Sequence, residues 1–587
     1  MRRFIVGFFA SIGVIVFVLV LAGLGLGVWF HVAGPRIADN TVLMLDLGGG
    51  FPDAPPSSAL SKLLFPGRPP LRDVLNALER AGDDPRVSGL VARFGDGEMG
   101  LAEAQELRDA VAAFRAKGKR AIAYSDSFGE FSSGTRSYYI ASAFDQIWLQ
   151  PLGLVGLVGL RVEQPYFRGT LDRLGVVPRF DHREEYKSAA DPITQNAMTA
   201  PDRAQVEALL NSVYGQVASG IAAGRKLDVA TVRGLVDRGP LLAQEALAAH
   251  LVDHIGYSDD AIAALGARPG GDRRLMPLTR YLAAVGEPHA RGPTIALIYA
   301  SGLIQRGRAE ANPLTGSSGL GADAVVQAFR MAARDRDVRA ILFRIDSPGG
   351  SAVASETIWR ATVEAKAAGK KLIVSMGDVA GSGGYYVAAA ADKIVAEPAT
   401  LTGSIGVLGG KLLLNGLLDK IGANTSAVQV GADAGLFSAF EDFSPDGRRR
   451  FESFLDDVYA VFKDRVAQGR KLDAAAVEAV AKGRIWSGED AKAHGLVDVL
   501  GGYATALAVA KSEAGIPADS DVTIKLFPPP QDAASTIIAR ALGEDTDSDE
   551  AHTAFGGAMA ALRPFLTAFE RLAAPAGALT MAPIEIH

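Results

Sequence analysis

The segment Ala340-Ile-Leu-Phe-Arg-Ile-Asp-Ser-Pro-Gly-Gly350 decides the fold, because an apolar run ends abruptly in a proline-glycine turn. An apolar run bounded by turn residues predicts a buried strand over 340–345. Similar runs at 294–299 and 371–375 predict two more strands, and an amphipathic pattern over 322–334 predicts a helix between the first two. Strands that alternate with helices of this length indicate parallel β-α-β units, so the sequence predicts an α/β fold.

The first half of the chain shows the same alternation. Apolar runs predict strands over 38–47, 87–94 and 120–124. Helical periodicity over 71–81 and 101–117 predicts helices between these strands. The first half is therefore expected to have the same β-α-β architecture as the second.

Matching segments in the two halves indicate an ancient duplication. The pairs occur in the same order along the chain, which is the signature of an internal repeat. They are Thr41-Val-Leu-Met-Leu45 with Thr294-Ile-Ala-Leu-Ile298, Tyr138-Tyr-Ile-Ala141 with Tyr385-Tyr-Val-Ala388, Gly224-Arg-Lys-Leu-Asp228 with Gly469-Arg-Lys-Leu-Asp473, and Leu251-Val-Asp253 with Leu496-Val-Asp498. The expected fold class is α/β, with tandem duplicated β-α-β units after an N-terminal helix.

The N-terminus predicts a membrane anchor. Residues 4–30 carry no charge, and about 20 apolar residues suffice to span a bilayer. The run is too long for a cleavable signal peptide, and His31-Val-Ala-Gly34 is a poor match to a cleavage site. The preceding pair Arg2-Arg3 favours a cytoplasmic N-terminus. The chain is expected to cross the membrane once, with its remainder on the periplasmic or extracytoplasmic side.

Shifts in composition suggest the domain boundaries. The expected domains are an anchor (1–34), a first half (35–257), a connection (258–293), a second half (294–526) and a partly disordered tail (527–587). The connection contains Arg268-Pro-Gly-Gly271, which breaks the periodicity. The tail contains Pro528-Pro-Pro530 and the acidic run 544–550, a composition typical of disorder.

Overall composition excludes several functions. The net charge is -6, and no long basic run follows the N-terminus, which argues against nucleic acid as a partner. The chain contains no cysteine. Disulfides, thiolate metal sites and a cysteine nucleophile are therefore excluded.

The motif Gly381-Ser-Gly-Gly-Tyr-Tyr386 places a serine between a strand and a helix. A short turn is expected over 376–381 and a helix over 383–391. Ser382 would then lie near the unpaired amides of the helix N-terminus, and the glycines would let a substrate approach the backbone. An N-cap serine flanked by packing glycines would have the same pattern.

The turn after the strand 340–345 is expected beside Ser382, because successive parallel strands end at the same edge of a sheet. The Pro-Gly-Gly turn of Asp346-Ser-Pro-Gly-Gly350 can present backbone N–H groups there, next to the amide of Gly383. Two such donors form the oxyanion hole that an acyl-transfer enzyme needs. A simple strand-to-helix turn would have the same sequence.

A serine nucleophile also needs a base. Of the eight histidines, only His182 stands near a candidate motif. A lysine can serve instead if burial lowers its pKa by about 2–3 units from the usual value near 10.4. Lys187 in Glu184-Glu-Tyr-Lys-Ser188 is one candidate, and Ser404 in Thr402-Gly-Ser-Ile-Gly406 offers a hydroxyl that would orient its amine. The local pattern alone does not separate Lys187 from a surface lysine.

Four motifs taken together resemble the signature segments of the signal peptide peptidase A family, membrane-bound serine proteases of the Clp-protease/crotonase fold. They are Glu185-Tyr-Lys-Ser-Ala189, Asp346-Ser-Pro-Gly-Gly-Ser351, Gly381-Ser-Gly-Gly-Tyr-Tyr386 and Thr402-Gly-Ser-Ile-Gly-Val407. The N-terminal anchor and the duplication match the long, two-halved form of the family. The resemblance covers nearly the whole chain except the tail. The family pattern usually has Asn where Asp346 stands.

The resemblance implies a site assembled from both halves. Ser382 would be the nucleophile, Lys187 the general base and Ser404 the hydroxyl that positions the lysine amine. The amides of Gly350 and Gly383 would form the oxyanion hole. No metal and no cofactor is implied.

The resemblance also implies the biological setting. The substrates would be cleaved signal peptides and other apolar peptides in or near the membrane. The protein would lie in the bacterial inner (cytoplasmic) membrane and assemble as a homo-oligomer, a tetramer in the long form.

Two other functions fit the same fold. A crotonase-like acyl-CoA enzyme would use the oxyanion hole for a thioester enolate, but it leaves Ser382, Lys187 and the anchor without roles. A non-catalytic membrane scaffold would be favoured if both halves had lost a catalytic partner. Here one complete set survives across the two halves, so the sequence favours the protease.

Overall fold

The computed structural model describes residues 37–54, 68–95, 97, 99–130, 132–268, 272, 274–308, 320–529 and 578–580, the last of these as backbone alone. The predicted membrane anchor (1–34) lies outside the described residues. No helix within the described ranges combines the length and the apolar character that crossing a bilayer requires.

Six parallel strands form the sheet of the first half, in the spatial order β8-β4-β3-β2-β1-β9. They are β1 (Thr41–Leu47), β2 (Val87–Phe94), β3 (Arg120–Ser125), β4 (Gln146–Leu149), β8 (His254–Ile255) and β9 (Leu275–Pro277). The short strands β5 (Leu154–Val155) and β7 (Leu241–Leu242) pair separately. The helices are α3 (Leu71–Asp83), α4 (Leu101–Ala116), α5 (Thr135–Ala141), α6 (Arg168–Leu174), α7 (Asp191–Thr194), α8 (Ala200–Arg225), α9 (Val229–Val236), α10 (Ala243–Ala248), α11 (Ser258–Ala263) and α12 (Leu278–Val285).

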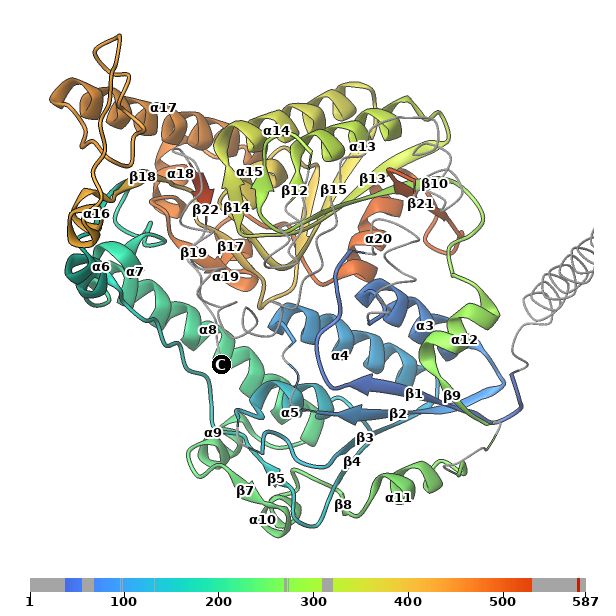
Figure 1. Cartoon of the computed structure of the whole chain (residues 1–587). Coiled ribbons are helices and arrows are strands. Elements are labelled where there is room, and N and C mark those ends of the chain that lie inside the picture. The colour runs from blue at the N-terminus through green and yellow to red at the C-terminus, as the bar shows by residue number, and fades with distance from the viewer. Residues whose placement is uncertain are drawn as a thin grey trace, which may run out of the picture.

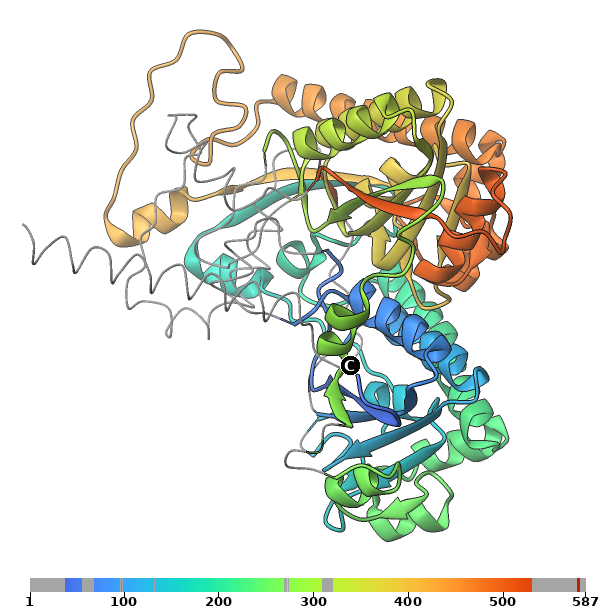
Figure 2. The same cartoon turned by 90° about the vertical axis from the view of Figure 1, so that its right-hand side faces the viewer.

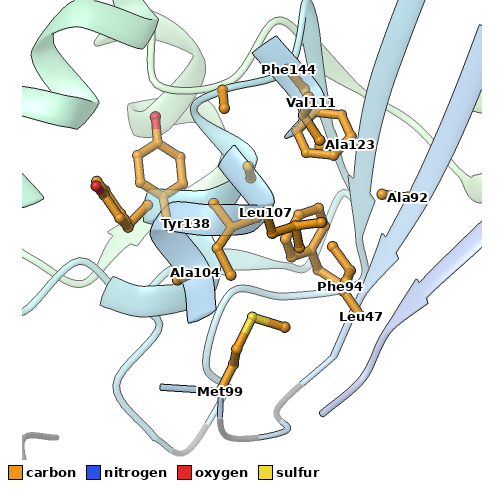
Figure 3. Close-up of a cluster of buried hydrophobic side chains, with 14 of the residues drawn as sticks. Leu47, Ala92, Phe94, Met99, Ala104, Leu107, Val111, Ala123, Tyr138 and Phe144 are labelled. Atoms are coloured by element: carbon orange, nitrogen blue, oxygen red, sulfur yellow. The ribbon is translucent and has the colours of Figure 1, made fainter. Parts of the chain in front are cut away.

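The core of the first half lies between its sheet and helices α4 and α5 (Figure 3). Leu107 and Val111 are four positions apart on α4, so both face the sheet. Phe94 of β2 packs edge-on against Phe144, with ring centroids 5.8 Å apart. Complete burial of each such side chain contributes about 1.5–3 kcal/mol to folding.

The second half forms its own sheet, in a separate lobe drawn above the first in Figure 1. The spatial order is β19-β17-β15-β13-β10-β21, with β16 beside β15 and β20 beside β16, and only β17 and β19 are antiparallel. The strands are β10 (Thr294–Ser301), β13 (Val338–Ser347), β15 (Lys371–Gly381), β16 (Lys393–Ala396), β17 (Leu401–Gly403), β19 (Ile485–Ser487), β20 (Val499–Leu500) and β21 (Thr523–Phe527). The helices are α13 (Ala322–Arg334), α14 (Ala352–Ala367), α15 (Gly383–Ala388), α16 (Asn415–Ile421), α17 (Pro445–Arg470), α18 (Ala474–Val480), α19 (Gly488–Ala493) and α20 (Tyr503–Glu513).

Strand β15 corrects one expectation. The sequence predicted a strand over 371–375 and a turn over 376–381, but the strand continues to Gly381. Its last residues pair in parallel with β17, with Val379 opposite Leu401. This partner lies more than twenty positions further along the chain, so no local pattern indicates the pairing. The strand therefore ends directly at Ser382.

The two halves repeat one another in three dimensions, which confirms the duplicated architecture. In the first half, the hydroxyl of Tyr138 donates to the Leu251 carbonyl oxygen at 2.6 Å. In the second, the hydroxyl of Tyr385 donates to the Leu496 carbonyl oxygen at 3.0 Å. The helices α8 and α17 each have 26 residues and end at a lysine with the same left-handed backbone, φ 55° and ψ 39°.

A third sheet joins the two halves. Its spatial order is β12-β11-β14-β22-β18-β6. The strands are β6 (Val177–Arg183), β11 (Ile304–Gln305), β12 (Leu320–Gly321), β14 (Gly349–Ser351), β18 (Val407–Leu413) and β22 (Ala578–Thr580). Strand β6 comes from the first half, and it pairs antiparallel with β18 from the second over seven residues.

A buried ion-pair cluster also links the halves. Arg344 of β13 is nearly inaccessible, and its guanidinium donates to Asp53 Oδ1 at 2.8 Å and to Glu106 Oε1 at 2.6 Å. Both carboxylates belong to the first half. In the opposite direction, Asp378 of β15 accepts hydrogen bonds from the amides of Ala102 and Glu103 at the start of α4. The interface is therefore specified by charge pairing as well as by packing.

Candidate active site

Ser382 lies where β15 meets α15, in a backbone conformation that residues with a side chain rarely adopt, φ 53° and ψ -114°. Its amide donates to the Gly403 carbonyl oxygen at 2.8 Å, and its carbonyl oxygen accepts from the Tyr386 amide at 2.8 Å. The side chain is completely buried. Backbone strain of this kind persists only where surrounding structure enforces it, and it is concentrated at functional sites.

Lys187 reaches Ser382 from the other half of the chain. Strand β6 extends to the second half, and Lys187 lies in the loop after it. Lys187 is only 1% exposed. The Lys187 Nζ lies 2.8 Å from Ser382 Oγ, 2.9 Å from the Ser404 carbonyl oxygen and 3.0 Å from Ser404 Oγ. The structure thus brings together three of the residues predicted from the sequence.

The environment of Lys187 favours the neutral amine. Burial lowers the pKa of Lys187 well below its usual value of 10.5, because the charged form loses its hydration. Within the described part of the chain, no carboxylate forms a hydrogen bond or an ion pair with Nζ that would restore the charge. A neutral amine has two hydrogens and one lone pair, which match the three oxygens around Nζ.

Ser404 is held in place by its own backbone. Its φ is 51°, and its amide donates to the Arg484 carbonyl oxygen at 2.7 Å. The carbonyl oxygen of Ser404 can only accept a hydrogen bond, so it takes one N–H of the Lys187 amine. The remaining contacts of that amine are the hydroxyls of Ser382 and Ser404.

Gly350 and Gly383 are neighbours at the end of this site. A Cβ on Gly383 would lie 3.1 Å from the Gly350 amide nitrogen, and a Cβ on Gly350 would lie 2.1 Å from the Ile304 carbonyl oxygen. Gly350 has φ 154°, a conformation that favours glycine. The two glycines predicted to form an oxyanion hole therefore lie side by side. Gly383 follows Ser382 in the chain, and Gly350 is the neighbour of Gly383 in space.

Asp346 stands where the family pattern usually has Asn, and it is not among the hydrogen-bond partners of the Lys187 amine in the described part of the chain. Its Oδ1 accepts a hydrogen bond from the Val379 amide at 3.0 Å. Burial raises the pKa of Asp346 to about 7, and the carboxylates of Asp53 and Asp378 add to the rise. Its carboxylate belongs to the charged interface between the halves, rather than to the contacts of Lys187.

His182, the alternative base, is not brought to the serine. Its ring is exposed, and its Nδ1 lies 2.8 Å from the Glu184 carbonyl oxygen. Among the described residues, the hydrogen-bond partner of the Ser382 hydroxyl is Lys187.

Sequence reasoning missed a polar network that positions the lysine loop. Ser188 Oγ donates to Asp202 Oδ1 at 2.6 Å, and the Gln205 side-chain amide donates to the Tyr186 carbonyl oxygen at 3.0 Å and to Asp202 Oδ1 at 2.9 Å. Ser188 follows Lys187 in the loop, Asp202 and Gln205 lie at the start of α8, and all three side chains are buried. In the sequence, the position of Ser188 directly after the lysine was the one hint of this network. Asp202 and Gln205 gave no hint, because they have the pattern of an ordinary helix start.

A strand of the same chain, β22, lies beside Gly350. The backbone of β22 runs antiparallel to β14, with Leu579 opposite Gly350. On its other side, Ala578 stands opposite Leu408 of β18. An extended peptide backbone therefore fits between β14 and β18, next to the glycine pair.

Comparisons with known proteins identify the family of the chain. The model of Peptidase family S49 matches residues 113–268, which contain Lys187, and residues 364–517, which contain Ser382 and Ser404. The chain is 32% identical over 500 residues to the chloroplastic serine protease SPPA of Arabidopsis thaliana, covering 83% of this chain and 71% of that protein. It is 31% identical over 545 residues to Protease 4 of Salmonella typhi, covering 86% of each.

A third relative gives the same result. Protease 4 of Haemophilus influenzae is 30% identical over 471 residues, which cover 78% of this chain and 74% of that protein. The family matches fall in both halves and span more than half of the residues. The chain therefore belongs to Peptidase family S49 and is a serine protease.

Proposed function

We propose that the protein cleaves peptides with a Ser/Lys dyad divided between its two halves, with Ser382 as nucleophile and Lys187 as general base. The observation that carries this proposal is the 2.8 Å contact between Lys187 Nζ and Ser382 Oγ in a fully buried site. Burial lowers the pKa of Lys187 and so favours the neutral amine, which is the form that can accept a proton.

The reaction proceeds in two stages. Lys187 takes the proton of the Ser382 hydroxyl while Oγ bonds to the peptide carbonyl carbon. The carbon–nitrogen bond then breaks, and the lysine ammonium gives its proton to the departing amine. Water, deprotonated by the same lysine, then attacks the acyl carbon. The bond from that carbon to Ser382 Oγ breaks, and the lysine returns its proton to Oγ as the acid product leaves.

The amides of Gly350 and Gly383 serve as the oxyanion hole. Negative charge develops on the carbonyl oxygen of the tetrahedral intermediate, and fixed N–H donors stabilise that charge without reorganising. The close approach of the two glycine backbones supports this role.

Replacing Ser404 with alanine is expected to lower kcat about two- to tenfold and to leave KM nearly unchanged. The change removes one hydrogen bond to the lysine amine, a loss of about 0.5–1.5 kcal/mol, while the Ser404 carbonyl oxygen still holds the other N–H. Steady-state kinetics on a peptide substrate measure the effect, with Ser512→Ala on the exposed surface of α20 as the matched control. Unchanged kcat would remove the assigned role.

The pH profile is expected to follow the lysine. Only the neutral amine is active, so kcat/KM rises with pH through the pKa of Lys187 and is lost below it. Because burial lowers that pKa, the plateau begins well below pH 10.5. Between the lowered pKa and 10.5 the unfolded chain binds a proton that the folded chain does not, so the free energy of unfolding also increases with pH in this window. A profile that reaches its plateau only near pH 10.5 would contradict a buried lysine base.

The substrates we infer are cleaved signal peptides and other apolar peptides. A peptide would take the strand position between β14 and β18, where main-chain hydrogen bonds give affinity irrespective of side chains. The apolar segment 4–30 supports the proposal that a single-pass anchor holds the site at the bacterial inner membrane, with the catalytic part outside the cytoplasm. We further propose a homo-oligomer, a tetramer.

The decisive assay uses the full-length protein in a mild detergent, with an apolar signal peptide labelled at both ends. Cleavage that a fluorophosphonate blocks, with covalent label found on Ser382 by mass spectrometry, would support the proposal. A folded protein that neither cleaves the peptide nor reacts with the fluorophosphonate would instead be a scaffold.

A further inference from the structure

Strand β15 contains a bulge just before Ser382. Its register against β13 shifts between Ile345 and Ser347, where the single residue Asp346 faces residues 377–379 of β15. Ahead of the bulge β15 pairs with β16, and from the last bulge residue onward it pairs with β17. A bulge bends its strand and re-aims the residues that follow. The bulge therefore directs the end of β15, and with it the serine, towards β17.

The first half follows a different course at this point. Its strand β3 pairs with β2 in unbroken register up to Ser125. The tyrosine pairs of the two halves lie 247 positions apart (138 to 385), and the same offset relates β5 to β17. Strand β5 nevertheless pairs with β7 in a separate two-stranded sheet. The bulge therefore belongs to the half that carries the nucleophile.

Side chains from two neighbouring strands hold the bulge. Asp346 Oδ1 accepts a hydrogen bond from the Val379 amide at 3.0 Å. The Thr400 hydroxyl donates to the Gly377 carbonyl oxygen at 2.8 Å. A Cβ on Gly377 would lie 3.1 Å from the Asp346 Cβ, so glycine leaves room for the aspartate. The middle residue of the bulge, Asp378, makes its contacts with the first half of the chain.

Asp378 caps a helix of that other half. Its Oδ1 accepts hydrogen bonds from the amides of Ala102 at 2.9 Å and Glu103 at 3.1 Å, the second and third residues of α4. An N-cap side chain normally satisfies these amides. The N-cap of α4 is Gly100, and a Cβ there would lie 1.7 Å from Asp378 Oδ2. Figure 1 and Figure 2 both show α4 on the side of the first half that faces the second.

In the second half, the equivalent helix caps itself. Helix α14 begins after Ser351, whose Oγ accepts a hydrogen bond from the Ala354 amide at 3.3 Å. In the duplicated sequence, residues 95–100 stand where residues 346–351 stand, so Gly100 takes the place of Ser351. The first half therefore relies on the strand that carries the nucleophile for the cap of α4.

We propose that Asp378 and Asp346 are positioning residues, which together fix the bulge of β15 and so set Ser382 beside Lys187 once the two halves have docked. Their role rests on the dyad proposed above. A displacement of about 1 Å at a reacting group can lower the rate about 10²-fold. Loosening the bulge should therefore lower kcat, whereas KM should change little because the peptide position lies between β14 and β18.

A second substitution separates positioning from simple helix capping. Asp378→Ala is expected to lower kcat about 10- to 100-fold and to lower the urea midpoint of unfolding. Adding Gly100→Ser should restore the midpoint, because α4 then has a cap of its own, as α14 has in Ser351. The double variant should keep the low kcat, because the bulge is still unattached to the first half. If kcat returned together with the midpoint, Asp378 would be a helix cap alone and the proposal would fall.

The matched control removes a helix cap remote from β15. Asp228 caps α9 in the first half, where its Oδ1 accepts from the Thr231 amide at 2.7 Å. Asp228→Ala should lower the urea midpoint and leave kcat unchanged. A comparable fall of kcat in this variant would show that any loss of helix capping slows the enzyme, which would also overturn the proposal.

Asp346 is tested by a conservative pair of variants. Asp346→Ala removes the acceptor of the Val379 N–H and is expected to lower kcat about tenfold. Asp346→Asn keeps an acceptor oxygen at the same place, so it should retain a kcat within about twofold of the parent. Equal losses in the two variants would contradict the assigned hydrogen bond.

Hydrogen exchange tests the bulge without a substrate. In full-length Asp378→Ala/Gly100→Ser, the amides of residues 377–386 should exchange faster than in the parent, as measured by mass spectrometry. Unchanged exchange there would overturn the proposal whether or not the parent cleaves peptides. A parent that cleaves no peptide but shows the faster exchange in the variant would instead remove the proposed function and leave the bulge contacts standing.

Discussion

Replacing Lys187 with alanine is expected to lower kcat/KM by at least about 10³-fold, and Ser382→Ala should reduce it as much or more. The serine loses its base in the first case and the nucleophile itself is lost in the second, and a positioned general base alone accounts for about 10²- to 10⁴-fold. The two losses should not add in the double variant, because the residues act as one unit. The measurement is kcat/KM on a signal-peptide substrate with the full-length protein.

Lys187→Arg is the informative companion. Arginine keeps its proton at any accessible pH, so it should be as inactive as alanine. Lys117→Ala, an exposed lysine of the first half, is the matched control and should retain full activity. If Lys187→Ala kept near-normal activity, the divided dyad would be wrong, and His182 would be the next base to test.

Replacing Arg344 with methionine is expected to cost about 3–5 kcal/mol of unfolding free energy. The change leaves Asp53 and Glu106 buried without their cation, and removing one partner of a buried pair costs about this much. Burial already raises the pKa of Glu106, and Arg344 opposes that rise. Without the arginine the Glu106 carboxylate takes up a proton on folding, so the loss of stability should be larger at pH 8 than at pH 5.

Urea unfolding at the two pH values measures this loss. Arg360→Met removes an exposed arginine that pairs with Glu364 one helical turn away, and it should change the unfolding free energy by less than about 1 kcal/mol. A loss of stability in Arg344→Met that is the same at both pH values would show that the cavity, rather than the unpaired carboxylates, is responsible.

The regular elements could be predicted from local sequence because they follow local rules. The helix expected over 322–334 has those bounds, and the strand expected over 87–94 does as well. Strand β15 was predicted too short because its last residues are held by β17, a partner distant in sequence. Local periodicity records which face is buried, and it carries no information about such pairings.

The site could be predicted only in part. Ser382 stands out because glycines surround it at a strand end, but Lys187 has the local pattern of a surface lysine, and family resemblance selected it. Lys187 lies 195 positions before Ser382 in the sequence. It reaches the serine only because β6 extends to the other half of the chain. The Asp202 and Gln205 network that fixes the lysine loop was missed for the same reason, because its partners meet only in the folded chain.

The division of the site between the halves has a consequence for biosynthesis. The ribosome completes the segment that contains Lys187 long before it completes the one that contains Ser382, and the contact between them requires β6 to pair with β18. Under the proposed dyad, a nascent chain that ends before Ser382 would have the base without the nucleophile. Hydrolytic capacity would then arise only when both lobes have folded and docked, so an unfinished polypeptide could not digest its neighbours. The proposed division of the dyad therefore couples activity to completed folding.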